Sequence, residues 1–138
     1  MKLLLSLSLA ASLVTGLAMA QESSSSSAAS SVPPPPAPVV EHWNTDEGGA
    51  MTLKVLPQSF DGTYENDNGR INGVLKDGVW NGYWGEDGSN QECPTAQLGT
   101  KFWGRIAFTF NADRTHFDGK WSYCDEDPSK GWSGDVAK

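Results

Sequence analysis

Few residues of this chain have the types and spacing that acid–base catalysis or metal binding requires. His116 and Asp118 lie two positions apart, and the run CDEDPSKG contains Asp125, Glu126 and Asp127. A histidine beside a carboxylate can transfer protons, and clustered carboxylates in a flexible loop can bind calcium. The sequence contains no His-Glu-x-x-His motif, no phosphate-binding loop and no Gly-x-Ser-x-Gly motif.

Each of these candidates also has a simple structural explanation. His116 falls on the polar side of an alternating segment, where a single surface histidine needs no catalytic role. The acidic run lacks the full set of ligand positions of a calcium loop, and so do Glu65 and Asp67 in ENDNGR. We therefore expect no catalytic residue, no metal site and no cofactor, and we interpret the protein as a non-enzyme.

Aromatic side chains give a stronger signal for binding. Four of the 6 tryptophans fall on the apolar face of alternating segments, where core packing is the default interpretation: Trp80, Trp84, Trp121 and Trp132. Trp43 lies outside the repeat. Tyr83 and Trp103 fall on the polar face instead. Outward rings can stack on sugars or contact a protein partner at low entropic cost. We predict that Tyr83, Trp103 and Arg105 form one exposed binding surface.

The segments that carry these residues alternate apolar and polar side chains with a period of two, which is typical of half-buried β-strands. An aromatic or aliphatic residue, a glycine and a second large residue recur at every other position in FDGTY, INGVL, WNGYW, FWGRI, FDGKW and WSGDV. The alternation predicts strands around residues 51–55, 60–65, 70–76, 80–84, 101–110, 116–123 and 132–136.

The glycines of this repeat lie on the apolar side, inside strands rather than in turns. Asp77-Gly78 is the natural two-residue turn, and it pairs Gly73 with Gly82. A four-residue loop at Asn66–Gly69 would bring Gly62 into the same row. The pattern thus predicts a row of glycines between rows of large side chains, which lets the sheet coil tightly.

No long helical pattern follows the first 20 residues, so the sheet must cover its own apolar face. About seven or eight short strands in sequential hairpin order predict an all-β antiparallel meander, either an up-and-down barrel or a strongly coiled sheet. A β-sandwich of two sheets is the alternative. The segment from Gly85 to Thr100 interrupts the meander.

The N-terminal residues predict a processing signal followed by a linker. Residues 1–20 combine Lys2, an apolar run and Ala-Met-Ala before Gln21, as in a secretory signal peptide. A retained signal anchor is the alternative. Residues 21–41, rich in serine and proline, predict a disordered linker, and residues 42–138 one all-β domain. We expect a secreted or periplasmic protein that does not insert into the membrane after signal cleavage.

Charge and cysteine content narrow the set of partners and compartments. Without Lys2, 9 basic residues stand against 17 acidic ones, a net charge of −8. This charge argues against nucleic acid and anionic membrane surfaces as partners. Cys93 and Cys124 are the only cysteines, and in an exported chain of this size we predict that they form a disulfide.

The run FDGTYENDNGRINGVLKDGVWNGYWGE, with FTFNADRTHFDGKW and GWSGD after it, resembles a pattern of small exported bacterial β-domains of undefined function. The resemblance covers about Met51 to Asp135 and rests on Gly62, Tyr64, Asn68, Gly69, Arg70, Ile71, Gly73, Gly82, Trp84, Glu86, Phe108, Phe110, Asp113, Phe117, Gly119, Trp121, Gly131, Trp132 and Gly134. It implies a β-domain and no particular activity. The Gly-x-Tyr and Gly-x-Trp strands are also loosely similar to avidin-type barrels, but the biotin-contacting motifs do not align, so no ligand is implied.

Two functional hypotheses follow from these observations. The first is a monomeric, non-catalytic exported domain that binds a glycan, an envelope component or a protein, a class that includes secreted inhibitors. The second is a small-ligand carrier with its site inside the barrel, although the large inward side chains argue against a roomy cavity. Whether the barrel interior is filled separates the two.

Overall fold

The computed structural model describes residues 32–138. The predicted signal peptide and residues 21–31 of the predicted linker lie outside the described residues. Residues 32–38 are exposed and have no regular secondary structure, and the first strand begins at Val39. Val39–Glu41, which composition assigned to the linker, therefore belong to the β-domain. Within the described part of the chain, no helix is long and apolar enough to cross a membrane.

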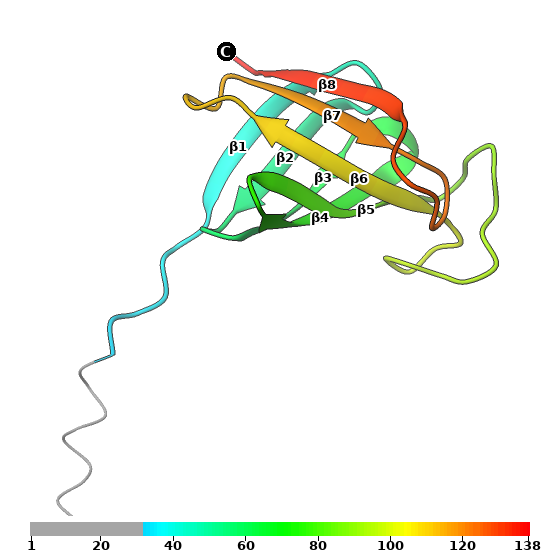
Figure 1. Cartoon of the computed structure of the whole chain (residues 1–138), viewed down its shortest axis with the longest axis horizontal. Helices are drawn as coiled ribbons and strands as arrows, with labels where there is room; N and C mark the ends of the chain where they lie inside the picture. Colours follow the sequence, from blue (N-terminus) through cyan, green and yellow to red (C-terminus); the bar gives the residue numbers. More distant parts are fainter. Residues whose placement is uncertain (1–31) are drawn as a thin grey trace, which may run out of the picture. The chain divides into compact units, whose positions relative to one another are not determined.

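Eight antiparallel strands form a closed barrel in sequential order, and β1 pairs with β8 to complete it (Figure 1). The strands are β1 (Val39–Thr45), β2 (Gly49–Val55), β3 (Ser59–Tyr64), β4 (Gly69–Lys76), β5 (Val79–Glu86), β6 (Phe102–Phe110), β7 (His116–Trp121) and β8 (Lys130–Val136). The predicted all-β meander is thus confirmed as an up-and-down barrel, and the alternative β-sandwich is wrong.

The middle of the barrel is filled by side chains, nearly all of which alternation assigned to the apolar face. Its buried core consists of Trp43, Met51, Leu53, Phe60, Tyr64, Ile71, Trp80, Trp84, Ile106, Phe108, Phe117 and Trp132. Inward and outward side chains alternate along every strand of such a barrel, and every strand contributes at least one inward residue to this core.

The glycine register is confirmed in part. Asp77 and Gly78 form the predicted turn with φ of 53° and 79°, and Gly73 pairs with Gly82. Gly62, however, pairs with Ile71 rather than with Gly73. The reason is the preceding turn: the 3₁₀ element η2 (Asn66–Asn68) closes it, so Gly69 already belongs to β4.

Aromatic rings, rather than other glycines, lie against several of the inward glycines. Phe60 pairs with Gly73 across β3 and β4, and a Cβ atom on Gly73 would lie 2.6 Å from Phe60 Cε1. Likewise a Cβ atom on Gly134 would lie 2.5 Å from Phe117 Cε1. The repeat therefore spaces glycines so that rings of neighbouring strands can lie flat against the backbone, which is why the barrel holds so many aromatic side chains.

One end of the barrel is closed by an arginine. The Arg114 guanidinium donates hydrogen bonds of 2.6 and 2.7 Å to the Glu41 carboxylate and lies 4.2 Å from the centre of the Phe110 ring. Trp43 also donates to Glu41 and contacts Phe110 with its ring, 5.2 Å between centroids. Trp43, which the repeat did not include, is therefore a core residue. We call this the closed end.

The opposite end carries the long connections. Residues 87–101 between β5 and β6 and residues 122–129 between β7 and β8 both lie there, on the right in Figure 1. The short turns that follow β1 and β3 lie at the same end, because alternate strands of an up-and-down barrel finish together. We call this the open end.

Candidate functional site

A cavity of about 230 Å³ lies at the open end. It is lined by Glu47, Gly48, Tyr64, Asn66, Asp67, Trp84, Glu86, Ser89, Asn90, Trp121, Tyr123 and Trp132. We call this cavity the end pocket. Its lining comes from the β1–β2 turn, the β3–β4 turn, both long loops and the adjacent ends of four strands.

Strand alternation explains which side chains reach the end pocket. Tyr64 and Glu86 are the last residues of β3 and β5, Trp121 is the last of β7, and Trp132 is near the start of β8. Each lies an even number of positions from a buried inward residue of its own strand, such as Phe117 for Trp121. The inward rows of these strands therefore continue past the packed core and end in the pocket.

Aromatic rings form two groups around the pocket. Trp84, Trp121 and Tyr123 contact one another edge to face, with centroid distances of 5.6, 6.0 and 5.0 Å. Tyr64 and Trp132 form the second group, 5.2 Å apart and nearly perpendicular. Edge-to-face packing is a favoured arrangement of aromatic pairs, so each ring of the wall is stabilised by a neighbouring ring.

A carboxylate lies among these rings. The Tyr64 hydroxyl donates a hydrogen bond of 2.9 Å to Oε1 of the half-buried Glu86. Burial raises the pKa of Glu86 above its ordinary value, while the hydrogen bond from Tyr64 opposes that rise. Burial, and then the neighbouring Glu86, raise the pKa of Tyr64 well above its ordinary value. Tyr64 therefore stays a hydrogen-bond donor to Glu86 at neutral pH.

The pocket is acidic. Glu47, Asp67 and Glu86 line it, and its lining residues include no lysine or arginine. Lys130 lies beside the lining: its Nζ atom is 5.7 Å from the centroids of both Trp121 and Tyr123. The pocket thus combines apolar ring surface with negative charge.

Two indole groups of the pocket lack hydrogen-bond acceptors. The Nε1 atoms of Trp121 and Trp132 are buried and have no partner among the described residues, whereas Nε1 of Trp84 donates to the Ser122 carbonyl at 2.9 Å. Buried N–H groups without an acceptor are uncommon and destabilising, by about 1–3 kcal/mol each.

The predicted aromatic surface lies on the outside of the barrel, but it is not an exposed platform. Tyr83 pairs with Arg105 across β5 and β6. The Tyr83 and Trp103 rings contact each other edge to face, with their centroids 5.7 Å apart. This contact agrees with the prediction that their strands are neighbours. Trp103 is nevertheless only 3% exposed, and its Nε1 atom donates to the Thr95 carbonyl at 2.7 Å. The expectation that Trp103 is exposed was wrong, because residues of the β5–β6 loop cover it.

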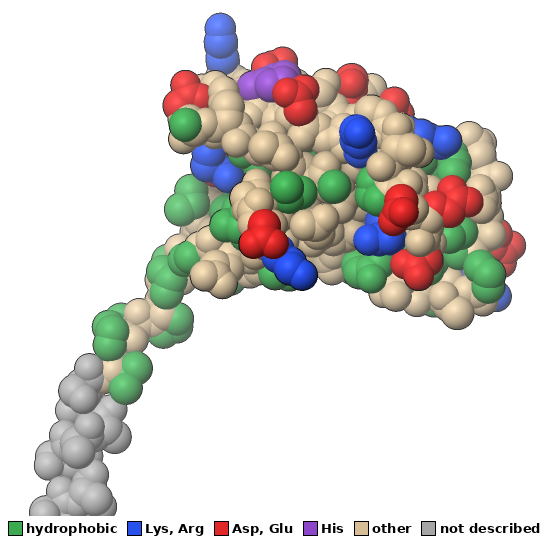
Figure 2. Space-filling view, viewed as in Figure 1, with side chains coloured by type: hydrophobic (Ala, Val, Ile, Leu, Met, Phe, Trp, Pro, Cys, Tyr) green, Lys and Arg blue, Asp and Glu red, His purple; other side chains and the backbone are tan. Residues whose placement is uncertain are grey.

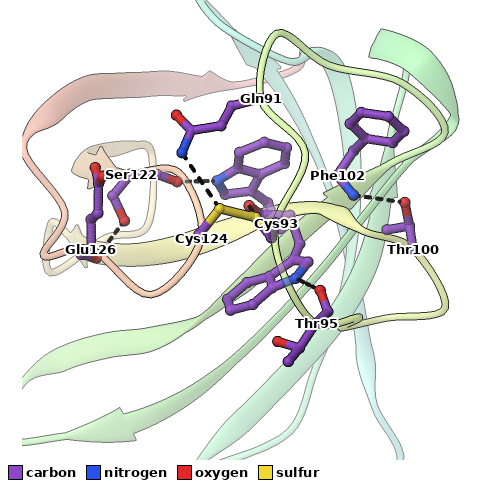
Figure 3. The surroundings of a disulfide bond; sticks show 10 residues. Gln91, Cys93, Thr95, Thr100, Phe102, Ser122, Cys124 and Glu126 are labelled. Atoms are coloured by element: carbon purple, nitrogen blue, oxygen red, sulfur yellow. Dashed lines mark hydrogen bonds between the residues drawn. A yellow bond between two sulfur atoms is a disulfide. The ribbon is translucent and has the colours of Figure 1, made fainter.

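The predicted disulfide holds this loop in place. Cys93 and Cys124 are bonded, with their Cα atoms 5.5 Å apart, as predicted. Figure 3 shows the bond joining the β5–β6 loop to the segment after β7, with Thr95 and Thr100 further along the loop. The bond is typical of proteins that fold in an oxidising compartment.

Tyr83 and Arg105 remain partly accessible, beside a shallow cavity of about 140 Å³. Arg105 is also engaged by Asp127, with 3.2 Å between Nη1 and Oδ1. On the face drawn in Figure 2, acidic and basic side chains are interspersed and hydrophobic ones lie in small separate patches. That face offers no extended apolar surface, and the binding role of Tyr83, Trp103 and Arg105 stays a prediction.

The acid–base candidates lie on the surface, apart from the end pocket. His116 contacts the carboxylates of Asp135 at 2.8 Å and Asp118 at 3.3 Å. The hydrogen bond with Asp135 and then that with Asp118 raise the pKa of His116 above 6.5. Within residues 32–138, no group of three or more histidine, cysteine, aspartate or glutamate side chains could hold a metal ion.

Sequence reasoning did not identify the pocket. It expected Tyr64, Trp84, Trp121 and Trp132 in the core, where the first two and Trp132 are buried and Trp121 packs against them. It expected Asp67 in a solvated turn, where that residue is exposed. The shared position of these residues was nevertheless readable in principle, since the last inward residues of alternate strands meet at one end of an up-and-down barrel. Ser89 and Asn90 lie in the long loop, where no periodicity exists to place them.

Comparison of the chain with protein-family models, with curated proteins and with solved structures gives no match.

Proposed function

We propose that this chain is an exported, non-catalytic binding protein that holds a small ligand in the end pocket. The observation that supports this best is the cavity of about 230 Å³ whose walls are five aromatic rings and three carboxylates. Barrels of eight strands have room for one small ligand at the mouth. The cavity of about 230 Å³ is many times larger than the roughly 10–15 Å³ that a single water molecule needs. A compact organic molecule fits that volume.

Aromatic walls with a few polar groups are typical of small-molecule sites. Here the polar groups include the half-buried carboxylate of Glu86, which is a hydrogen-bond acceptor. The pocket therefore supports the carrier hypothesis more strongly than the outer face supports the partner-surface hypothesis.

We also propose that the protein is exported, and this part of the proposal does not depend on the pocket. Residues 1–20 predict a signal peptide, the disulfide is typical of oxidising compartments, and the glycine–aromatic pattern resembles small exported bacterial β-domains. A mature chain that begins at Gln21, measured by intact mass after expression in a bacterium, is the expected result. An uncleaved chain retained in the cytosol would contradict it.

The binding proposal is tested by titrating ¹⁵N-labelled protein with a library of small polar and charged fragments. We expect shifts of the indole N–H signals of Trp84, Trp121 and Trp132. Trp43 and Trp80, which lie toward the closed end, serve as internal controls. No fragment that moves the first group, or fragments that move both groups equally, would contradict the proposal.

A matched pair of variants locates the site. Ser89→Trp adds a large side chain to the lining of the pocket and should abolish the fragment-induced shifts. Ser59→Trp adds the same side chain to β3 near the closed end and should leave them unchanged. Loss of the shifts in both variants would mean that they report a general change of fold.

A further inference from the structure

We infer that the end pocket selects a small organic cation, an alkylammonium group. This inference rests on the proposed function and names the class of ligand. It depends on the charge of the lining and on the ring surface beside it.

The charge of the lining favours a cation over an anion or a neutral ligand. Glu86 lies half-buried between the rings, Glu47 and Asp67 lie exposed at the rim, and no basic residue lines the pocket. An anion would meet three carboxylates at short range. A neutral ligand would exclude water from Glu86 without replacing it by any opposite charge, which disfavours the ionised carboxylate.

The rings favour an alkylated ammonium group over a metal ion. A cation over the face of tryptophan or tyrosine is attracted by the ring quadrupole, and the attraction grows when water is excluded. The protein already places a cation against two of these rings, since Lys130 Nζ lies 5.7 Å from Trp121 and from Tyr123. Metal ions prefer several oxygen ligands, whereas most of this wall is aromatic carbon.

The test compares three probes by calorimetric titration of the whole protein. Choline carries the cation and a hydroxyl, 3,3-dimethyl-1-butanol is its neutral isostere, and phosphocholine adds a phosphate as in a lipid head group. We expect choline to bind at least about tenfold more tightly than the isostere, as expected for a partly desolvated cation–π site with a nearby carboxylate. Phosphocholine should bind more weakly than choline, because its phosphate adds negative charge to a ligand in a pocket lined by three carboxylates.

Glu86→Gln and Asp61→Asn form a matched pair of variants. Each removes one negative charge, but Glu86 lies in the pocket and Asp61 lies exposed on the outer face of β3. We expect Glu86→Gln to lose the preference for choline over the isostere and Asp61→Asn to keep it. The indole spectrum of each variant reports whether its fold is intact.

The outcomes separate this inference from the proposed function. Equal binding of choline and its isostere would overturn the cation inference and leave the small-ligand proposal standing, as would fragments that shift Trp121 and Trp132 while choline does not bind. Tighter binding of phosphocholine would overturn the preference for a free cation. If no compound of any class perturbs the pocket tryptophans, both proposals fail.

Discussion

The Tyr64 hydroxyl donates a 2.9 Å hydrogen bond to the Glu86 carboxylate, joining the ends of β3 and β5, which are not neighbours in the barrel. Among residues 32–138, this bond is the one direct polar link between an aromatic wall of the end pocket and the Glu86 carboxylate. It holds the Tyr64 ring against Trp132 and lowers the pKa of Glu86, against the rise caused by burial.

Tyr64→Phe should therefore raise the pKa of Glu86 further above its ordinary value. It should also destabilise the protein by about 1–3 kcal/mol, the usual range for loss of a hydrogen bond to a charged group. Carbon-detected NMR titration of the Glu86 carboxyl measures the first effect and thermal unfolding the second. Tyr123→Phe removes a hydroxyl from the same pocket but no contact with Glu86, so it is the matched control. An unchanged Glu86 pKa in Tyr64→Phe would contradict the assigned hydrogen bond.

His116 should titrate with a pKa above 6.5 because Asp135 and Asp118 stabilise its charged form. The folded-state pKa is the higher one, so the stabilising contribution is complete below 6.5 and is lost as the pH rises through the raised value. Proton NMR of the imidazole measures this pKa. Asp135→Asn should lower it more than Asp118→Asn does, since the Asp135 contact is the shorter one. The opposite order would contradict the geometry.

Gly73→Val should destabilise the barrel by more than about 1 kcal/mol, through overpacking against a ring that cannot yield easily. The new Cβ atom would lie 2.6 Å from Phe60 Cε1. Gly131→Val is the control, because nothing lies within 4 Å of a Cβ atom at that strand position. Urea unfolding of both variants gives the comparison. Equal midpoints for the two variants would mean that Phe60 has room to move.

Removal of the disulfide by Cys93→Ala with Cys124→Ala should destabilise the protein by about 3–4 kcal/mol, given the loop between the two residues. The same change should free the β5–β6 loop from Trp103. Thermal unfolding measures the first effect, and exchange of the Trp103 indole hydrogen, now bonded to Thr95, measures the second. Continued protection of that hydrogen would show that the loop covers Trp103 without help from the disulfide.

Lys130→Gln should tighten the binding of choline if the end pocket selects cations. The Lys130 ammonium group lies 5.7 Å from the Trp121 and Tyr123 rings, where it repels a second cation. Lys120→Gln removes the same charge from β7, from a residue that does not line the pocket. Equal affinity of the two variants would mean that Lys130 does not influence the pocket.

The repeat predicted most of the fold because it contains two kinds of structural information. Alternation shows which side chains of each strand point into the barrel. The inward glycines leave space for aromatic rings on neighbouring strands, which allows the sheet to close into a barrel. β1 was not predicted as a strand because VVEHWNT lacks the glycine repeat and follows a proline tract. The register of β3 was shifted because Asp67 and Asn68 adopt positive φ, at 43° and 54°, in place of the glycine that was expected to turn.

The binding site was harder to predict because it depends on which loops and side chains cover the outer and inner faces of the sheet. Alternation correctly placed Trp103 outside the barrel, yet the covering loop has no periodicity that reveals its path. Tyr64, Trp84 and Trp132 were correctly placed inside, but facing alone does not say whether the space beside a ring is filled. Packed core and pocket wall carry the same sequence signal, and only the three-dimensional ends of the strands separate them.

The two ends of the barrel carry different residues: the Arg114–Glu41 pair lies at the closed end, and the proposed binding residues lie at the open end. The Arg114–Glu41 pair lies at the other end of the barrel from Ser89 and Asn90, and these two loop residues take part in no strand pair. A substitution at either of them changes the pocket lining without removing a strand pair. Ligand preference can therefore diverge between related chains while stability is kept, so this architecture is suited to evolving a series of binding specificities on one unchanged barrel.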